Sequence, residues 1–133
     1  MTTAEAFELA IPAICVWREA RGEPLEAQRG VWWVIQNRAN DALNRWPKSK
    51  AGVVLEKFQF SSFNSNDPNA SKIPGVADRA FSQIGAMMDD STTPDPTSGA
   101  NAYHSYSNPS EYPAWATSDK FVVTIGNIHF YKL

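Results

Sequence analysis

The stretch W-R-E-A-R-G-E-P, residues 17–24, places a helix end, a turn and a helix start within one short segment. Before it, apolar side chains recur at helical spacing, at Phe7, Ile11, Ile14 and Cys15. Gly22 and Pro24 then end this helix, and Pro24 suits the first position of a second helix. The pattern therefore predicts that Glu19 lies in the last helical turn and that Glu23 lies in the connection that follows.

The length and composition are those of one ordinary globular domain, which we expect to span residues 1–133. Hydrophobic residues make up 43% of the chain, and the formal net charge is −2. A protein with this net charge has no large positively charged surface that would bind nucleic acid or an anionic membrane. No apolar run approaches the roughly 20 residues that a membrane span needs. We therefore expect no nucleic-acid partner and no membrane insertion. We also expect a monomer.

Cysteine content and the N-terminus bear on the compartment. Cys15 is the one cysteine, so no internal disulfide forms and folding does not need an oxidising compartment. The first residues, M-T-T-A-E-A-F-E, lack the basic region of a signal peptide. These features favour a protein made in the cytoplasm without a signal peptide, or a secreted protein without its leader.

The remaining pattern predicts further helices followed by a small β element. The expected segments are a second helix over 24–46 closed by Pro47, a short helix over 53–57, a polar loop over 59–75, a third helix over 76–88, and two strands within 121–133 joined at Gly126-Asn127. Helices followed by strands indicate an α+β domain, mainly helical with a small C-terminal antiparallel β element.

Glu19 is the first candidate for chemistry. The C-terminal end of a helix carries partial negative charge, which disfavours an ionised carboxyl group there. Trp17, together with Trp32 or Trp33 from the second helix, is expected to exclude water from it. Both effects favour a protonated carboxylic acid, which is what a general acid needs to cleave a glycosidic bond. The alternative is that Glu19 and Glu23 belong to a solvated or salt-bridged helix surface.

Glu23 has a different setting, because it precedes Pro24 at the start of the second helix, where negative charge is favoured. We expect it to stay ionised and to pair with Arg21 or Arg29. Its first interpretation is then a structural anchor of the loop, and an electrostatic contribution to the site is the alternative.

Aromatic, amide and hydroxyl side chains are interleaved in the polar segments. Rings that pack on sugar C–H groups, with amides and hydroxyls that bind sugar hydroxyl groups, would form a glycan-binding groove. The alternative is that most of these rings fill the core. The aromatic residues are Trp17, Phe58, Phe60, Phe63, Tyr103, Tyr106, Tyr112, Trp115, Phe130 and Tyr131, and the polar ones are Gln59, Ser61, Asn64, Ser105 and Asn108.

Cys15 raises the alternative of a thiol nucleophile assisted by His104 or His129, as in a cell-wall amidase or peptidase. An activated thiolate prefers a helix N-terminus, whereas Cys15 lies late in its helix on the apolar side. A buried, unreactive thiol is therefore the favoured interpretation. Two histidines without a motif such as H-E-x-x-H predict no metal site, and we expect no cofactor.

Short blocks along the chain form a recognisable series. W-R-E-A-R-G-E at 17–23 is followed by Gln28, by Asn37-Arg38, by Q-F-S at 59–61, by D-P-T-S-G-A at 95–100, by P-A-W at 113–115 and by I-G-N-I-H-F-Y at 125–131. In this order and spacing, the blocks resemble the SleB-type cell-wall hydrolases, the spore-cortex-lytic family. The resemblance covers almost the whole chain, from about Ile14 to Tyr131.

The resemblance implies a lysozyme-like fold and cleavage of peptidoglycan glycan strands between N-acetylmuramic acid and N-acetylglucosamine. It also implies a lytic transglycosylase, which closes a 1,6-anhydro ring instead of adding water, with Glu19 as the essential acid. Gly99 and Gly126 are expected in backbone turns, and Asn37 with Arg38 is expected to brace the E-A-R-G-E loop. The residues expected to bind substrate or line the site are Glu23, Gln59, Ser61, Tyr103, His104, Trp115 and His129.

A muramidase-type hydrolase is the alternative within this reaction class. It needs a second carboxyl group, roughly 5–5.5 Å away for retention or 6.5–9.5 Å away for inversion. Glu23 and Asp95 are the candidates, although D-P-T around Asp95 is also typical of a turn. A glycan-binding module without catalysis is a third interpretation. Without the leader and glycan-binding repeats usual in the spore enzymes, the sequence is also similar to a phage or prophage endolysin that acts on the cell wall.

Overall fold

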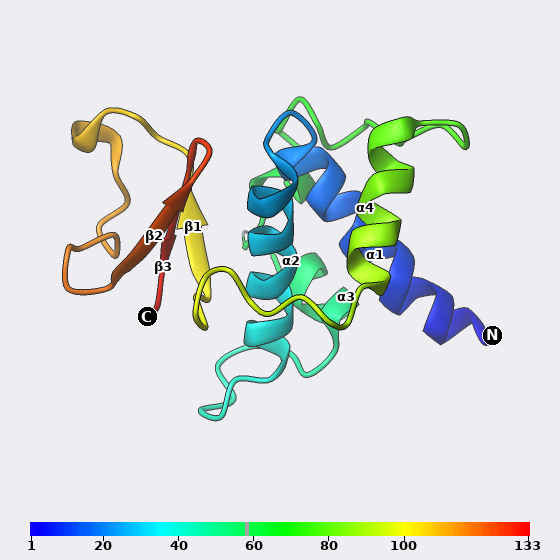
Figure 1. The fold of residues 1–133 in the computed structure, drawn as a ribbon, viewed down its shortest axis with the longest axis horizontal. Helices are drawn as coiled ribbons and strands as arrows, with labels where there is room; N and C mark the ends of the chain where they lie inside the picture. Colours follow the sequence, from blue (N-terminus) through cyan, green and yellow to red (C-terminus); the bar gives the residue numbers. More distant parts are fainter. Residues whose placement is uncertain (58) are drawn as a thin grey trace.

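The computed structural model describes residues 1–57 and 59–133, and it shows a helical body beside a small antiparallel sheet (Figure 1). This architecture confirms the expected mainly helical α+β class. Phe58, one of the aromatic residues considered above, lies outside the described residues. Among the described residues, no helix has the length and apolar character needed to cross a membrane. The elements are α1 (Thr3–Ala20), α2 (Leu25–Ala39), α3 (Lys50–Leu55), α4 (Arg79–Asp89), β1 (Ala102–His104), β2 (Phe121–Ile125) and β3 (Ile128–Tyr131), with short 3-10 turns at Ser61–Phe63 and Pro109–Glu111.

Helix α1 ends where its sequence predicts, and a capping box at Thr2 sets its start. Thr2 Oγ1 accepts the N–H of Glu5 at 3.1 Å, while Glu5 Oε2 accepts the N–H of Thr2 at 3.1 Å, which makes a reciprocal capping box. The helix continues through Pro12 and does not restart there. It ends at Ala20, so Glu19 lies in the last turn.

Helix α2 is shorter than predicted. It begins directly after Pro24 and ends at Ala39 rather than at Trp46. Beyond it, the Asp41 carboxylate accepts the backbone N–H of Arg45 at 2.9 Å and its guanidinium N–H groups at 3.0 Å. These hydrogen bonds lower the pKa of Asp41 to about 2. The prediction was wrong here because an aspartate that binds the backbone locally favours a turn over continued helix.

Side-chain caps set the starts of α3 and α4. Ser49 Oγ accepts the N–H of Gly52 at 2.9 Å, and α3 therefore starts at residue 50 rather than 53. Asp78 Oδ1 accepts the N–H of Phe81 at 2.9 Å, and α4 starts at residue 79 rather than 76. In each case a polar residue supplies an acceptor for otherwise unpaired N–H groups of the first turn.

The sheet has the strand order β1-β3-β2, and both strand pairs are antiparallel. The β2–β3 hairpin turns at Gly126, whose φ of +60° favours glycine, as the sequence predicts. Strand β1 was not predicted, because so short a strand has too little alternation to be recognised. Its pairing places His104 opposite His129 and Ala102 opposite Tyr131.

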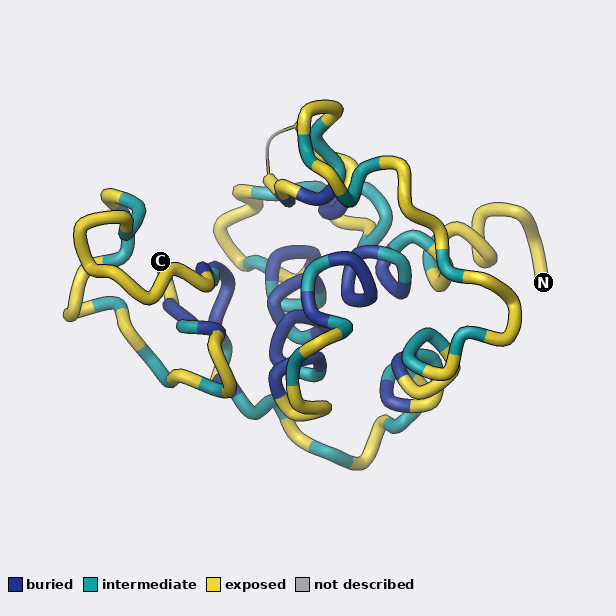
Figure 2. Tube along the Cα trace, turned by 90° about the horizontal axis from the view of Figure 1, so that it is seen from above, coloured by how far each residue is buried: buried dark blue, intermediate teal, exposed yellow. Residues whose placement is uncertain are grey.

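Phe130 on β3 joins the sheet to the helical body. Its ring is fully buried, and a Cβ added to Gly30 on α2 would lie 2.5 Å from Phe130 Cζ. Gly30 therefore allows the sheet to approach α2 (Figure 1). Buried segments run through both the helices and the adjacent part of the sheet (Figure 2). The fully buried side chains include Cys15, Val16, Val31, Val34, Ile35, Val53, Val54, Ile84 and Phe130.

Replacing Gly30 with alanine should lower the free energy of unfolding by about 1–3 kcal/mol, because the added methyl group must displace the buried Phe130 ring. Gly85→Ala is the matched control, since Gly85 also lies inside a helix but has open space at its Cβ position. That substitution should be neutral or stabilise by up to about 1 kcal/mol. Urea unfolding followed by circular dichroism measures both, and equal effects would contradict the packing role of Gly30.

His104 is a buried histidine inside an aromatic cluster. Its Nδ1 accepts the N–H of Tyr106 at 3.2 Å, so the proton lies on Nε2, which donates to Tyr131 Oη at 3.1 Å. The rings of Tyr112 and His129 pack on it, with centroids 4.3 and 5.0 Å away. Burial, with a smaller contribution from His129, lowers the pKa of His104.

The burial of His104 predicts a loss of stability in mild acid. In the unfolded chain a histidine has a pKa of about 6.5, so the unfolded state binds this proton more tightly than the folded state does. The stability is therefore fully present above about pH 6.5 and is lost as the pH falls through the lower pKa of the folded protein. Between about pH 7 and pH 5, the melting temperature of His104→Gln should fall less than that of the parent protein. An equal fall would refute this assignment.

Candidate active site

Glu19 lies at the end of α1, and its half-buried carboxyl group is held from two sides. The hydroxyl of Tyr103 on β1 donates to Glu19 Oε1, and the N–H of Ser62 donates to Glu19 Oε2 at 3.3 Å. Hydrogen bonds from such donors stabilise a carboxylate and fix its position. Three segments far apart in the sequence, the end of α1, the Ser61–Phe63 turn and β1, therefore meet at this carboxyl group.

Two adjoining hollows meet at Glu19, and both are lined by Arg18, Glu19, Ser105 and Ile128. The larger, of about 820 Å³, runs along the E-A-R-G-E loop and the hairpin turn, and we call it the loop half. The smaller, of about 430 Å³, runs along the polar loop and β1, and we call it the aromatic half. Together they form one groove that continues on both sides of the carboxyl group.

Two arginines near Glu19 are buried, and neither pairs with it. Their guanidinium groups donate instead to backbone carbonyl oxygens. The acceptors are Lys72 at 2.9 Å and Ser62 at 3.3 Å for Arg18, and Asn101 at 2.6 Å for Arg38. Burial lowers the pKa of Arg38. Among the described residues, no arginine forms an ion pair with Glu19.

Gln28 holds the E-A-R-G-E loop from inside the protein. Its buried side-chain amide donates to the carbonyl oxygens of Ala20 at 3.1 Å and Glu23 at 3.2 Å. The chain that follows Glu19 is therefore fixed against α2. Gln28 belongs to the series of blocks in the sequence, but its function as the brace of this loop was not predicted.

Asn37 and Arg38 do not brace that loop, contrary to expectation. Asn37 Nδ2 donates to Asp95 Oδ2 at 2.9 Å and to the carbonyl oxygen of Ala100 at 2.8 Å, and Arg38 binds farther along the same segment. The Asp95 carboxylate also accepts two N–H groups of the turn that follows it, at 2.8 and 2.9 Å. This turn includes Gly99, whose φ of +94° fits the expected backbone role. Asp95 is thus a turn anchor, and it lines neither half of the groove.

Glu23 closes the loop half of the groove by binding the hairpin turn. Its carboxylate accepts the N–H of Asn127 at 2.7 Å and Asn127 Nδ2–H at 3.1 Å. A Cβ on Gly126 would lie 2.9 Å from Glu23 Oε1, so this contact also needs glycine. Glu23 is therefore the structural anchor that was expected, but its partner is Asn127 rather than Arg21 or Arg29.

The tryptophans expected to exclude water from Glu19 lie elsewhere. Trp17 Nε1 donates to Asp78 at 3.3 Å, and Trp17 does not line the groove. Trp32 and Trp33 line a separate hollow between α2 and the end of α4. This part of the prediction was wrong because helical spacing alone does not show which neighbour each side of α2 meets.

Tyr103 is the aromatic residue that contacts Glu19. Its ring packs against Phe60 and Phe130, with centroids 6.3 and 6.0 Å away. Burial and the neighbouring Glu19 raise the pKa of Tyr103 well above its usual value, so the phenol stays a neutral donor. An apolar wall and one oriented hydroxyl group therefore bound the carboxyl group on this side.

Most of the expected site-lining residues do lie along the groove. Trp115 is the exception, because it lines neither half and packs edge-on against Tyr131, with centroids 5.3 Å apart. Asp67 and Asn69 were missed, since their polar loop has no periodicity from which to place them. The expected residues on the aromatic half are Gln59, Ser61, Tyr103 and His104, and those on the loop half are Glu23 and His129.

Cys15 is fully buried, and burial raises the pKa of its thiol. A substrate cannot reach this sulfur without opening the core, which counts against a thiol nucleophile. Within residues 1–57 and 59–133, no group of three or more His, Cys, Asp or Glu side chains is placed to hold a metal ion. Glu19 is the acidic residue that lines both halves of the groove.

Comparison with curated proteins identifies relatives among cell-wall enzymes. The sequence matches the Cell Wall Hydrolase family over residues 22–131. The spore cortex-lytic enzymes of Bacillus subtilis (strain 168) and of Oceanobacillus iheyensis are each 42% identical to this chain over 55 residues, which is 41% of its length. The matched segment spans 17% and 19% of those two relatives, so it corresponds to less than a fifth of their length.

Solved structures extend the similarity to nearly the whole chain. The catalytic domain of the germination-specific lytic transglycosylase SleB from Bacillus anthracis is similar with a TM-score of 0.69 and 25% identity, over 95% of this chain and 94% of that one. The catalytic domain of the Bacillus cereus SleB protein gives 0.70 and 26%, over 96% and 91%. These similarities confirm the fold expected from the sequence blocks. Since the family match covers most of its length, the chain belongs to the Cell Wall Hydrolase family.

Proposed function

We propose that this protein cleaves peptidoglycan glycan strands between N-acetylmuramic acid and N-acetylglucosamine, as a lytic transglycosylase with Glu19 as its catalytic acid. The observation that carries the proposal is the position of the Glu19 carboxyl group between the two halves of one groove. A polymer lying along the groove would present a glycosidic bond to Glu19 with sugars on both sides. The similarity to SleB catalytic domains, one of them described as a lytic transglycosylase, supports the same reaction.

In the proposed reaction one carboxyl group acts twice. Protonated Glu19 donates to the glycosidic oxygen while the bond between that oxygen and the anomeric carbon of muramic acid breaks. The muramoyl 6-hydroxyl oxygen then attacks the anomeric carbon, and its proton passes to the Glu19 carboxylate. The products are a free hydroxyl on one fragment and a 1,6-anhydro ring on the other. Glu19 ends protonated, no water is consumed, and no cofactor is required.

Tyr103 and Ser62 act on the charged form of Glu19 between these two steps. Both donate a hydrogen bond to the carboxyl group, to Oε1 from the phenol and to Oε2 from the backbone. Donors placed in advance stabilise charge as it develops and cost no reorganisation. They also keep the carboxyl group facing the same point in the groove for both proton transfers.

The contacts of the other acidic residues favour a transglycosylase over a muramidase. Glu23, the nearest candidate in sequence, is engaged through both carboxylate oxygens by Asn127. Asp95 binds its own turn outside the groove, and Asp67 Oδ1 accepts the N–H of Asn69 at 2.8 Å. A ring-closing reaction needs none of these three groups as a base, because the 6-hydroxyl returns its proton to Glu19.

We further propose that the protein meets this substrate in the cell wall, outside the compartment where it is made. A phage or prophage endolysin and a secreted enzyme both satisfy that requirement. Cleavage of glycan strands would be the shared activity in either case.

Replacing Glu19 with glutamine should lower the rate of muropeptide release from purified sacculi by about 10²–10⁴-fold, because glutamine cannot donate or accept the transferred proton. The fold and binding to sacculi should be preserved, since Gln is nearly isosteric. Glu23→Gln is the matched control, and it should retain at least about a tenth of the activity, because the proposed reaction needs no second carboxylate. A fully active Glu19→Gln protein would exclude Glu19 as the acid.

Mass spectrometry of the released fragments tests the outcome of the reaction. We expect 1,6-anhydro-muramoyl ends, because ring closure takes the place of water. Reducing ends would instead indicate a muramidase or glucosaminidase, and a Glu23→Gln protein as inactive as Glu19→Gln would point in the same direction. Free amines or peptides would indicate an amidase or peptidase.

Replacing Tyr103 with phenylalanine should lower kcat by about 10–100-fold, because a hydrogen bond to a charged group contributes about 1.5–3 kcal/mol. The ring and its packing on Phe60 and Phe130 are retained, so the fold should not change. Tyr106→Phe removes a hydroxyl group from the same half of the groove without touching Glu19, and it should change kcat by less than about threefold. Similar losses in both variants would contradict the role of Tyr103.

A further inference from the structure

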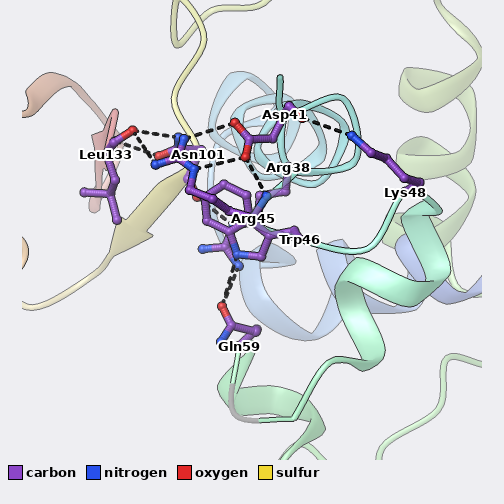
Figure 3. A network of polar contacts seen from close by, with 8 residues as sticks. All are labelled: Arg38, Asp41, Arg45, Trp46, Lys48, Gln59, Asn101 and Leu133. Atoms are coloured by element: carbon purple, nitrogen blue, oxygen red, sulfur yellow. Dashed lines mark hydrogen bonds and ion pairs between the residues drawn. The ribbon is translucent and has the colours of Figure 1, made fainter. Parts of the chain in front are cut away.

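Gln59 stands out on the aromatic half because its side-chain amide is oriented by two fixed neighbours. Arg38 Nη1 and Trp46 Nε1 both lie 3.4 Å from Gln59 Oε1, and each donates a hydrogen bond to it. Figure 3 shows both hydrogen bonds ending at the Gln59 oxygen. Gln59 is exposed, and it lines the groove on the same side as Tyr103.

The chemistry of these two neighbours determines which arm of the amide faces them. A guanidinium group and an indole N–H can donate hydrogen bonds but cannot accept them. The atom that faces both must therefore be the carbonyl oxygen of Gln59, and a flipped amide would oppose donor to donor. The NH₂ group consequently faces away from Arg38 and Trp46. Within the part of the chain that the structure describes, this NH₂ group donates to no other residue.

Arg38 and Trp46, the two donors to Gln59 Oε1, are themselves held by neighbouring groups. Two guanidinium groups pack against the Trp46 ring, with Arg38 Cζ 5.0 Å and Arg45 Cζ 4.8 Å from its centroid. Arg45 is fixed by Asp41 at 3.0 Å, and Arg38 by the carbonyl oxygen of Asn101 at 2.6 Å (Figure 3). Rings and guanidinium groups stacked in this way restrict rotation of the indole. The orientation of the Gln59 amide is therefore prepared before any ligand arrives.

We propose that Trp46 and Arg38 position the Gln59 amide to donate a hydrogen bond to the acetamido carbonyl oxygen of an amino sugar in the groove, so that Gln59 selects N-acetylated over de-N-acetylated glycan. This inference rests on the proposed function and names the part of the substrate that this residue recognises. A fixed donor selects for an acceptor, whereas sugar hydroxyl groups can match either role. The acetamido oxygen is the strong neutral acceptor that recurs along such a strand. A de-N-acetylated sugar offers an ammonium group there, which opposes the donor.

The test exchanges the donor for an acceptor of the same shape. Gln59→Glu keeps an oxygen toward Arg38 and Trp46 and turns the second arm into a carboxylate oxygen. Binding is measured by calorimetry in the Glu19→Gln background, so that no strand is cleaved. The ligands are soluble peptidoglycan glycan strands stripped of their peptides, used fully N-acetylated and after enzymatic de-N-acetylation, at a mildly acidic pH that keeps the amines charged.

With Gln59 in place, the N-acetylated strand should bind at least about 10-fold more tightly than the de-N-acetylated one. Gln59→Glu should weaken binding of the N-acetylated strand about 10-fold and reverse the preference, because its carboxylate pairs with the ammonium group. Gln83→Glu makes the same change in net charge at an exposed position on α4 away from the groove, and it should leave the preference unchanged.

Two results would overturn the inference, and they are distinguishable from each other. Equal loss of affinity for both strands in Gln59→Glu would exclude recognition of the acetamido group while leaving the proposed function intact. Failure of the Glu19→Gln protein to bind either strand would overturn the proposed function together with this inference.

Trp46→Phe tests the positioning role separately. Phenylalanine keeps an aromatic ring next to Arg38 and Arg45 but removes the indole N–H that donates to Gln59 Oε1. The Trp46→Phe substitution is made in the active protein, with Glu19 unchanged. Its KM for the N-acetylated strand should rise about 3–10-fold, while its kcat should change by less than about twofold. A fall in kcat with unchanged KM would contradict a positioning role in substrate binding.

Discussion

The site depends on how two buried guanidinium groups are satisfied. Charge inside a protein must find partners, and a carboxyl group close by is the usual choice. Here Arg18 and Arg38 bind backbone carbonyl oxygens on segments that the helices alone would leave unattached, at Ser62, Lys72 and Asn101. The same hydrogen bonds fold the polar loop and the start of β1 against the helices. They also leave the Glu19 carboxyl group without an ion-pair partner among the described residues.

The sheet contributes in a second way, because it carries the residue that touches Glu19. Tyr103 lies on β1, which pairs with β3, and β3 is joined to α2 where Phe130 packs on Gly30. Tyr103 is the register partner of Phe130, and the two rings lie 6.0 Å apart on the same face of the sheet. The position of the Tyr103 hydroxyl group at the end of α1 therefore depends on the contact between Phe130 and Gly30. A bulky residue at position 30 would move the whole strand pair, and the phenol with it.

Local signals in the sequence predicted the helix that ends after Glu19, the hairpin at Gly126 and the glutamate that anchors the loop. These features depend on residues that are close together along the chain. The end of α2 was misplaced because Asp41 competes for the backbone, and the three tryptophans were misassigned because periodicity does not reveal neighbours. The functions of Gln28, Asn37 and Tyr103 all depend on long-range contacts. Tyr103 was predicted to line the site, whereas Gln28 was given no function and Asn37 was assigned to the wrong loop. In all three cases only the fold identifies the partner.

The two groove glutamates differ in what their contacts permit. Both oxygens of Glu23 hold the hairpin turn through Asn127, so moving Glu23 toward a sugar would break two hydrogen bonds and release the turn. Among the described residues, the Glu19 carboxyl group accepts one hydrogen bond from a phenol and one from a backbone N–H, and neither donor is a charged group. In the proposed cycle one carboxyl group gives a proton and takes one back, and neither transfer breaks the hydrogen bonds that hold the hairpin turn. A second catalytic carboxylate at Glu23 would first have to leave its structural contacts with Asn127, which supports the ring closure that we propose.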